Sequence, residues 1–141
     1  MSDAAMRRTG IGLTVLVALF WAMDGAMKLA NLAPVAQTMG PLGWPTDSAT
    51  ILTLGLIQTG SLALYLWPKS SVLGAILLTA YLGGAIATHA RIGSPLPSHT
   101  LFGVYVGVFT WAALWFRSPA LRALIPPVSY THLTLPTKRI V

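Results

Sequence analysis

Hydrophobic residues fall into four long blocks along the chain, and short segments rich in Pro, Gly, Ser and charged residues separate them. The blocks cover residues 11–32, 49–67, 71–90 and 100–117. Each block is close to the roughly 20 residues that a helix needs to cross about 30 Å of hydrocarbon. A soluble chain of 141 residues cannot bury four such blocks in one core. The pattern therefore predicts an all-α fold, an integral membrane four-helix transmembrane bundle in contact with the lipid bilayer.

The composition excludes several function classes. Hydrophobic residues make up 55% of the chain and charged residues only 9%, which is far from the balance of soluble proteins. The net charge is +6, but Lys and Arg lie at the ends of the apolar blocks, so we exclude nucleic acid as a partner. The lack of Cys excludes thiol chemistry, disulfides, covalent haem attachment and Cys-ligated zinc. No zinc motif or phosphate-binding loop is present, and we expect no metal site.

Basic residues are distributed unequally between the two sides of the predicted bundle. The side that holds the N-terminus, the turn at 68–70 and the segment after residue 116 carries Arg7, Arg8, Lys69, Arg117 and Arg122. The other side carries Lys28 and Arg91. The positive-inside rule therefore predicts a multi-pass protein of the bacterial cell (inner) membrane with both termini in the cytoplasm. The first span lacks an A-x-A cleavage site, so we expect it to remain uncleaved.

The last fourteen residues, 128–141, differ from the rest of the chain. Their sequence, VSYTHLTLPTKRIV, contains no span, cap or amphipathic period. It resembles the translated sequencing-adapter read-through found at the ends of assembled metagenomic fragments. We therefore expect a membrane domain at 1–127 and a non-native tail at 128–141. Leaving out Lys138 and Arg139 lowers the formal net charge from +6 to +4.

Local signals predict how the spans are joined and packed. Pro68 ends the second span, and Ser70 or Ser71 is expected to cap the third, which makes spans two and three an antiparallel hairpin. The loop 33–48 is expected to lie in the outer interface, with Val35, Met39 and Trp44 as apolar anchors. Aromatic residues are expected at the cytoplasmic boundary: Tyr65, Trp67, Trp111, Trp115 and Phe116. Small residues with a spacing of four are expected at helix contacts: Ala18, Ala22, Ala26 and Ala30, then Ala80, Gly84 and Thr88, then Gly103 and Gly107.

Two charged residues lie inside the first span, where each costs roughly 2.5–3.5 kcal/mol on insertion scales. Asp24 and Lys28 are four residues apart, so they share one helix face and can neutralise each other. One interpretation is an internal ion pair whose Lys28 reaches toward the outer surface. The topology also delivers polar groups of spans three and four to the same end, namely Thr88, His89, Arg91, His99 and Thr100. The second interpretation is therefore a ligand site at the outer end.

A quinone fits such a site because its head group is polar and its tail is soluble in lipid. Its carbonyl oxygens would accept hydrogen bonds from Lys28 and from a His N–H, and a histidine would move protons during reduction. The alternative for each histidine is an interfacial residue bonded to water or to a loop carbonyl. A haem held between His89 and His99 is disfavoured because both residues lie at one membrane edge. Gln58, Thr79 and Tyr81, near the middle of their spans, are expected to form hydrogen bonds across the bundle.

Several segments resemble the DoxX-like family of membrane proteins. The most specific is 71–91, which contains YLGGA and ATHAR; 93–96, 98–102, 111–117 and Met27-Lys-Leu also resemble it. The likeness extends from about Thr9 to Pro126. Seven residues of this chain occupy positions of the family's sequence pattern: Lys28, Tyr81, Gly83, Gly84, His89, Arg91 and Trp111. Where an acidic residue and an aromatic are common in the loop, this chain has Ser94 and Pro97.

The resemblance implies a four-helix membrane bundle and says little about activity. Relatives in the wider group include small membrane subunits of thiosulfate:quinone oxidoreductases, components of redox-stress complexes, and cargo receptors or chaperones. Our first hypothesis is an accessory subunit that binds a quinone or similar lipid-soluble molecule and serves an oxidoreductase subunit on another chain. The second is a non-catalytic assembly or chaperone-type protein that binds partner helices, including a homo-oligomer, and the third is a minimal transporter. The candidate ligand-binding cluster is Asp24, Lys28, Tyr81, His89, Arg91 and His99, with no catalytic residue assigned.

Overall fold

The computed structural model describes residues 2–125, so the proposed tail at 128–141 lies outside the described residues. This part of the chain is mostly helical and contains no strand. Its α-helices are α1 (Asp3–Leu29), α2 (Ala33–Met39), α3 (Ser48–Leu66), α4 (Ser71–Arg91), α5 (Phe102–Arg117) and α6 (Pro119–Leu124). A 3₁₀ helix, η1 (Gly40–Leu42), follows α2, and a π-helical turn, η2 (Leu96–Thr100), precedes α5. The all-α prediction is confirmed.

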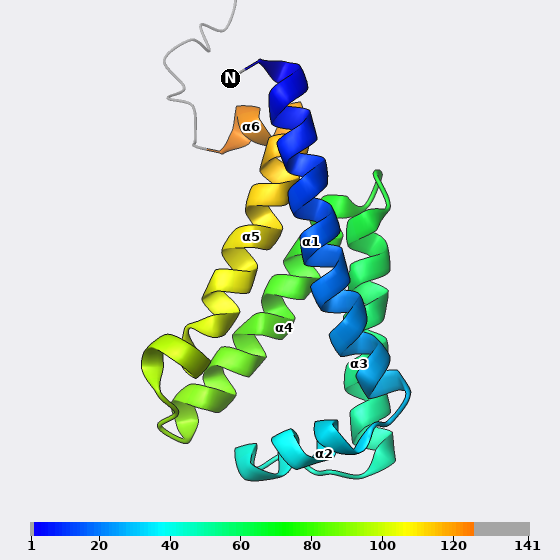
Figure 1. The fold of residues 1–141 in the computed structure, drawn as a ribbon, viewed down its shortest axis with the longest axis vertical. Coiled ribbons are helices and arrows are strands. Elements are labelled where there is room, and N and C mark those ends of the chain that lie inside the picture. Colours follow the sequence, from blue (N-terminus) through cyan, green and yellow to red (C-terminus); the bar gives the residue numbers. More distant parts are fainter. Residues whose placement is uncertain (1, 126–141) are drawn as a thin grey trace, which may run out of the picture.

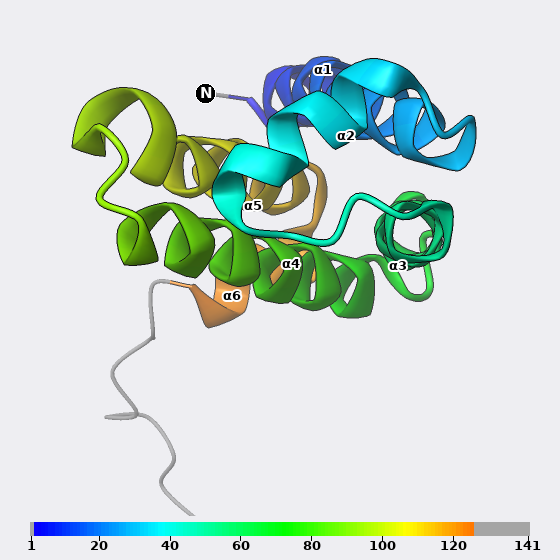
Figure 2. The same ribbon diagram turned by 90° about the horizontal axis from the view of Figure 1, so that it is seen from below.

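Four helical stretches are long and apolar enough to cross a membrane: α1, α3, α4 and the stretch Leu96–Arg117. They run antiparallel to one another in chain order (Figure 1). Helices α1 and α4 both pack against α3 and α5, so α1 and α4 lie opposite each other across the bundle. We call the end with α2 and η2 the α2 end, and the end with the N-terminus and α6 the terminal end (Figures 1 and 2).

Helix α1 differs from its predicted span, whereas α3 and α4 lie within one residue of theirs. The helix begins at Asp3 rather than residue 11 because Ser2 caps it, its hydroxyl accepting from the Ala5 amide at 3.3 Å. It ends at Leu29 rather than residue 32 because Asn31 adopts a left-handed conformation, with φ of 49°. The apolar block therefore continues past the helix into the turn before α2.

The α3–α4 hairpin is tight because Gly74 lies against the backbone of α3. A Cβ atom on Gly74 would lie 2.1 Å from the Tyr65 amide nitrogen, so only glycine fits at this contact. Pro68 lies in the turn between the two helices, as predicted. The expected serine cap is wrong for Ser70, whose hydroxyl instead donates to the Leu64 carbonyl at 2.9 Å. That carbonyl belongs to the last turn of α3, where helix carbonyls lack partners.

The predicted small-residue contacts are confirmed on α5 and wrong on most of α1 and α4. Gly103 packs against Ile86 of α4, and Gly107 against Leu82. In contrast, the predicted contact residues Ala22, Ala26, Ala30, Ala80 and Gly84 are all exposed. The buried face of α1 carries Gly10, Val17, Trp21 and Gly25 instead. Gly25 lets α1 pack closely against α3, because a Cβ on Gly25 would lie 2.7 Å from the Thr59 hydroxyl of α3.

The loop 33–48 folds back onto the bundle, and two of its three expected anchor residues are buried. Val35 and Met39 of α2 are buried and pack with Ile51 of α3. Trp44 is 40% exposed, and its indole N–H donates to the Thr88 hydroxyl of α4 at 3.3 Å. The segment thus crosses the α2 end from α3 toward α4 (Figure 2). The anchor prediction is wrong for Val35 and Met39 because burial against Ile51 satisfies their apolar side chains.

One predicted interfacial aromatic residue belongs to the core. Tyr65 has no exposed surface, and its hydroxyl donates to the Thr110 carbonyl at 2.9 Å. The core around it includes Trp21, Leu78 and Leu114. Trp67, two residues further along, is 64% exposed. Tyr65 was misassigned because its position near a helix end gave no sign that its side chain points inward.

Candidate functional site

The intramembrane charges form an ion pair on the face of α1 that meets α3. The Lys28 ammonium donates to the Asp24 carboxylate, and the side chains of Lys28 and Asp24 are 12% and 38% exposed. Gly55 of α3 makes room for this contact, because a Cβ there would lie 2.9 Å from Lys28 Cβ. Lys28 therefore turns back along α1 toward Asp24 instead of reaching outward to the surface, and that part of the prediction is wrong.

Tyr81 of α4 faces this ion pair from across the bundle. Its ring centre lies 5.9 Å from the Lys28 ammonium, within the range of a cation–π interaction. The Trp21 ring meets the Tyr81 ring at 6.0 Å in an edge-on arrangement. In residues 2–125 the Tyr81 hydroxyl has no hydrogen-bond partner, so the expected cross-bundle bond is not formed. Tyr81 contacts the α1 residues through its ring.

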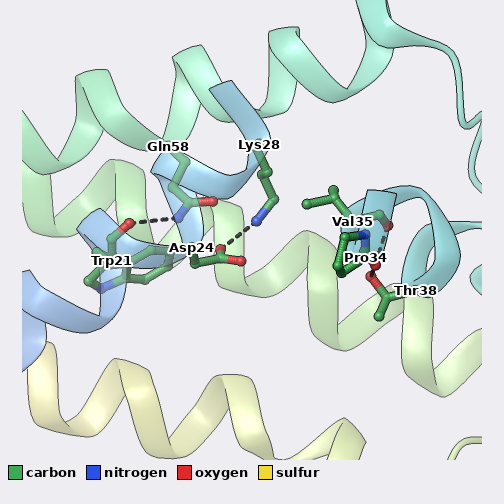
Figure 3. A network of polar contacts seen from close by, with 7 residues as sticks. All are labelled: Trp21, Asp24, Lys28, Pro34, Val35, Thr38 and Gln58. Atoms are coloured by element: carbon green, nitrogen blue, oxygen red, sulfur yellow. Dashed lines mark hydrogen bonds and ion pairs between the residues drawn. The ribbon is translucent and has the colours of Figure 1, made fainter. Parts of the chain in front are cut away.

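Gln58 of α3 completes this group. Its side chain has no exposed surface, and its amide nitrogen donates to the Trp21 carbonyl at 3.0 Å. This bond confirms the prediction that Gln58 links two helices. Its other amide atom, Oε1, is buried and has no hydrogen-bond partner among the described residues. Figure 3 shows Oε1 on the side of Gln58 that faces the Asp24–Lys28 pair. We call Trp21, Asp24, Lys28, Gln58 and Tyr81 the Lys28 cluster.

The two histidines form a separate pair at the α4–α5 connection. The rings of His89, in the last turn of α4, and His99, in η2, have their centres 5.7 Å apart. His89 Nδ1 is 3.0 Å from the Ser94 hydroxyl, and His99 Nδ1 is 2.8 Å from the Ser98 hydroxyl. Serine hydroxyls therefore orient both rings, in place of the water or loop carbonyl expected for an interfacial histidine.

Arg91 holds the α2 segment in place. Its guanidinium donates to the Leu42 carbonyl of η1 at 2.7 Å, next to the bond from Trp44 to Thr88. Gly43 is part of this contact, because a Cβ on it would lie 2.9 Å from Arg91 Nη2. Gly43 also has φ of 78°, a conformation that glycine adopts without strain. Arg91 thus fastens the segment to α4 rather than joining the Lys28 cluster.

The six predicted site residues therefore occupy three places at one end of the bundle. Asp24, Lys28 and Tyr81 come together, His89 and His99 come together, and Arg91 lies apart. No hydrogen bond, ion pair or ring contact in residues 2–125 joins the Lys28 cluster to the histidine pair. Within the same residues, no group of three or more His, Asp or Glu side chains is arranged to hold a metal ion.

Sequence reasoning did not include Gln58 or Trp21 in the site. The available signal was that Gln58 is the one amide side chain in the middle of an apolar span. Such a residue needs a buried partner because lipid offers no hydrogen bonds. Which partner it finds depends on the rotation of α1 against α3, and a hydropathy pattern does not contain that rotation.

An apolar groove of about 390 Å³ lies at the terminal end, far from the Lys28 cluster along the bundle axis. It is lined by Trp111, Ala112, Trp115, Phe116, Leu121 and Ile125. The Trp115 indole donates to the Ile125 carbonyl at 2.7 Å, which joins two of the lining residues. The described residues that line the groove expose no polar surface to it and so cannot orient a polar head group, and we place the candidate site at the Lys28 cluster.

Four apolar helices that pack as an antiparallel bundle around a few buried polar groups define a multi-pass membrane protein of the lipid bilayer. The chain belongs to the DoxX-like family, whose sequence profile matches residues 12–113. The matched range contains the whole Lys28 cluster and the histidine pair, and it confirms the resemblance of the sequence. No match was found among curated proteins or solved structures.

Proposed function

We propose that this protein is an accessory membrane subunit of an oxidoreductase system and that it binds the head group of a quinone, or of a similar lipid-soluble molecule, at the Lys28 cluster. The supporting observation is the Lys28 ammonium, which lies inside the bundle between Asp24 and the Tyr81 ring. A cation inside a membrane span is costly, so it is retained where it is paired or has a function. Electron transfer itself is assigned to another chain.

The cluster offers complementary groups to a flat, polar head group. An ammonium carries three N–H donors, and among the described residues Lys28 uses them only toward Asp24. A quinone carbonyl would accept from a remaining donor, and the rings of Trp21 and Tyr81 would supply apolar contact. His89 and His99 lie at the same end without touching Lys28, so we assign them proton exchange with the aqueous side rather than head-group contact.

The proposal includes the expected placement in the bacterial inner membrane with cytoplasmic termini. The α2 end would then face the outer side, and the head group would bind near the outer leaflet. A quinone tail is soluble in lipid and would extend between the helices. The quinone would thus enter sideways from the bilayer.

Binding of decylubiquinone to purified protein in mild detergent tests this proposal. The double variant Asp24→Asn/Lys28→Met removes both charges together, so no lone buried charge is left to unfold the bundle. We expect its affinity to fall by at least about tenfold, a change of 1.4 kcal/mol. The matched control is Lys69→Met, a lysine exposed on the α3–α4 turn. Wild-type affinity in the folded double variant would contradict the proposed site.

His89→Ala separates proton exchange from binding. We expect normal decylubiquinone affinity and slower reduction in membranes that contain the partner enzyme. A native purification in mild detergent, followed by mass spectrometry of proteins and lipid-soluble cofactors, tests the subunit role directly. A preparation with neither a quinone nor an oxidoreductase partner would contradict it.

A second candidate function is a non-catalytic assembly or chaperone-type protein that binds partner helices. It is favoured by small residues on exposed faces: Ala22 and Ala26 on α1, Ala30 directly after α1, and Gly83 and Gly84 on α4. A Cβ on Gly83 or Gly84 would meet nothing within 4 Å. Small residues let partner helices approach closely in a membrane. Under this function, Gly84→Leu would abolish a partner complex or a homo-oligomer while quinone affinity stayed unchanged.

A further inference from the structure

We infer that the Lys28 cluster prefers the reduced, hydroxyl-bearing form of its ligand, and that Gln58 Oε1 accepts a hydrogen bond from the ligand hydroxyl. The inference rests on the proposed function and deepens it, because it names the redox form that the site holds more tightly. Its basis is the oxygen of a fully buried amide, which has no hydrogen-bond partner within residues 2–125.

The orientation of the Gln58 amide follows from its neighbour. Its nitrogen lies 3.0 Å from the Trp21 carbonyl oxygen, which can only accept a hydrogen bond. Turning the amide over would place two acceptor oxygens against each other, so the assigned orientation is the one that the contact allows. The free amide atom is therefore an acceptor, and only a donor can satisfy it.

Gln58 lies beside Lys28 in the contact between α1 and α3. Gly55, one turn before Gln58 on α3, contacts Lys28. Gln58 itself lies near Gly25 of α1, because a Cβ on Gly25 would be 3.6 Å from the side-chain nitrogen of Gln58. In Figure 3 the Gln58 side chain extends toward α1, with Oε1 on the side of Asp24 and Lys28. A ligand oxygen bound to the ammonium thus lies on the side of the unpartnered acceptor.

A donor at Lys28 and an acceptor at Gln58 match a hydroxyl group, which both accepts and donates. A quinol hydroxyl would accept from the ammonium and donate to Oε1. A quinone carbonyl would accept from the ammonium but leave Oε1 without a partner and facing another oxygen. Sites built to bond a hydroxyl reject analogues that lack it because their polar groups are left unpaired. We therefore expect the quinol to bind at least about tenfold more tightly.

The preference has a redox consequence. A site that binds the quinol more tightly than the quinone raises the midpoint potential of the bound couple. For a two-electron couple a tenfold preference corresponds to about 30 mV. The bound ligand would then be easier to reduce than the free quinone in the bilayer. A site of this kind accepts electrons from its partner and releases the quinol slowly.

Two other donors can satisfy Oε1 without a ligand. The Lys28 ammonium can turn toward it, or a water molecule can bridge it to Asp24. In either case the acceptor is already occupied when the ligand arrives, and the ligand hydroxyl gains nothing from Gln58. The two redox forms would then bind equally, which distinguishes these cases from the proposal.

The experiment compares decylubiquinone, decylubiquinol and the dimethyl ether of decylubiquinol, under anaerobic conditions, with the full chain in lipid nanodiscs. We expect the quinol to bind at least tenfold more tightly than the quinone or the ether, since neither of these can donate. Gln58→Met keeps the side-chain length and removes the acceptor, and we expect it to abolish the preference by weakening quinol binding. The matched control is Gln37→Met, an exposed glutamine on α2, which should keep the preference.

Equal binding of quinol and quinone to the wild-type protein would overturn the inference while leaving the proposed function intact. An unchanged preference in a folded Gln58→Met variant would also overturn it. If Gln58→Met does not fold, the three probes on the wild-type protein decide the question without it. Binding of none of the probes would overturn the proposed function and the inference together.

Discussion

The Lys28 ammonium of α1 lies 5.9 Å from the centre of the Tyr81 ring of α4, although these two helices lie on opposite corners of the bundle. The Trp21 ring reaches the same tyrosine from seven residues before Lys28, nearer the terminal end of α1. Lys28 therefore lies inside the bundle, whereas its partner Asp24 stays partly exposed. Substitutions of Asp24 and Lys28 therefore test both the stability of the bundle and the binding of a ligand.

Removing one partner of the ion pair should destabilise the protein more than removing both. Asp24→Asn leaves the Lys28 ammonium without its counter-ion, and we expect a loss of about 2 kcal/mol in the free energy of unfolding. This is below the roughly 3–5 kcal/mol of a fully buried pair. Asp24 is 38% exposed, which explains the smaller value. The change in the free energy of unfolding is measured by SDS titration in mixed micelles, with circular dichroism as the readout.

The double variant Asp24→Asn/Lys28→Met is the control for this prediction. It should recover most of the lost stability because neither charge remains. If the double variant is as unstable as the single one, packing around Lys28 rather than its charge stabilises this part of the bundle.

Substitution of Gly74 should disrupt the α3–α4 hairpin. An alanine Cβ at this position would meet the Tyr65 backbone at 2.1 Å, so α3 and α4 would have to separate. Overpacking of this kind costs typically about 1–3 kcal/mol. We expect Gly74→Ala to lose at least that much in the same SDS titration, or to fail to fold.

Gly84→Ala on the same helix is the matched control. A Cβ at Gly84 meets nothing within 4 Å. Alanine is favoured over glycine in a helix by about 1 kcal/mol, so stability should stay equal or rise. An equal loss in both variants would mean that the contact with the Tyr65 backbone does not determine the cost at Gly74.

Arg91 should control how firmly the α2 segment is held. Arg91→Met removes the bond to the Leu42 carbonyl and keeps most of the side-chain length. We expect faster hydrogen–deuterium exchange across residues 33–45 and unchanged exchange in α3 and α4. Trp44→Phe, which removes the bond to Thr88, should add to the effect.

Arg8→Met provides the comparison for Arg91, because Arg8 is exposed at the opposite end. It should leave exchange in residues 33–45 unchanged. If Arg91→Met also leaves it unchanged, burial of Val35 and Met39 is sufficient to hold the segment.

The orientation in the membrane is tested by single cysteines, because the chain contains none of its own. Thr46→Cys marks the α2 end and Lys69→Cys the α3–α4 turn, and both positions are exposed. With both termini in the cytoplasm, a membrane-impermeant maleimide added to spheroplasts should label Thr46→Cys at once. It should label Lys69→Cys only after the membrane is opened. The reverse pattern would contradict the predicted orientation.

Hydropathy was sufficient to predict the four helices and the α3–α4 turn. In lipid every backbone polar group must be bonded within its own segment, so a long apolar block has one outcome, a helix. Pro68 cannot continue such a helix, which placed the hairpin turn. The DoxX-like segments added the family, since they are carried by local sequence and need no packing information.

Packing was needed to learn which face of each helix points inward. The alanines at 22, 26 and 30 and the glycines at 10 and 25 are all small, yet only the two glycines are buried. In the same way, topology placed Lys28, His89 and Arg91 at one end without telling whether they touch. They do not, because Lys28 turns into the α1–α3 contact, His89 bonds to Ser94 and Arg91 bonds to η1. Hydropathy depends on each residue alone, whereas helix rotation and side-chain direction depend on neighbours that are far away in the chain.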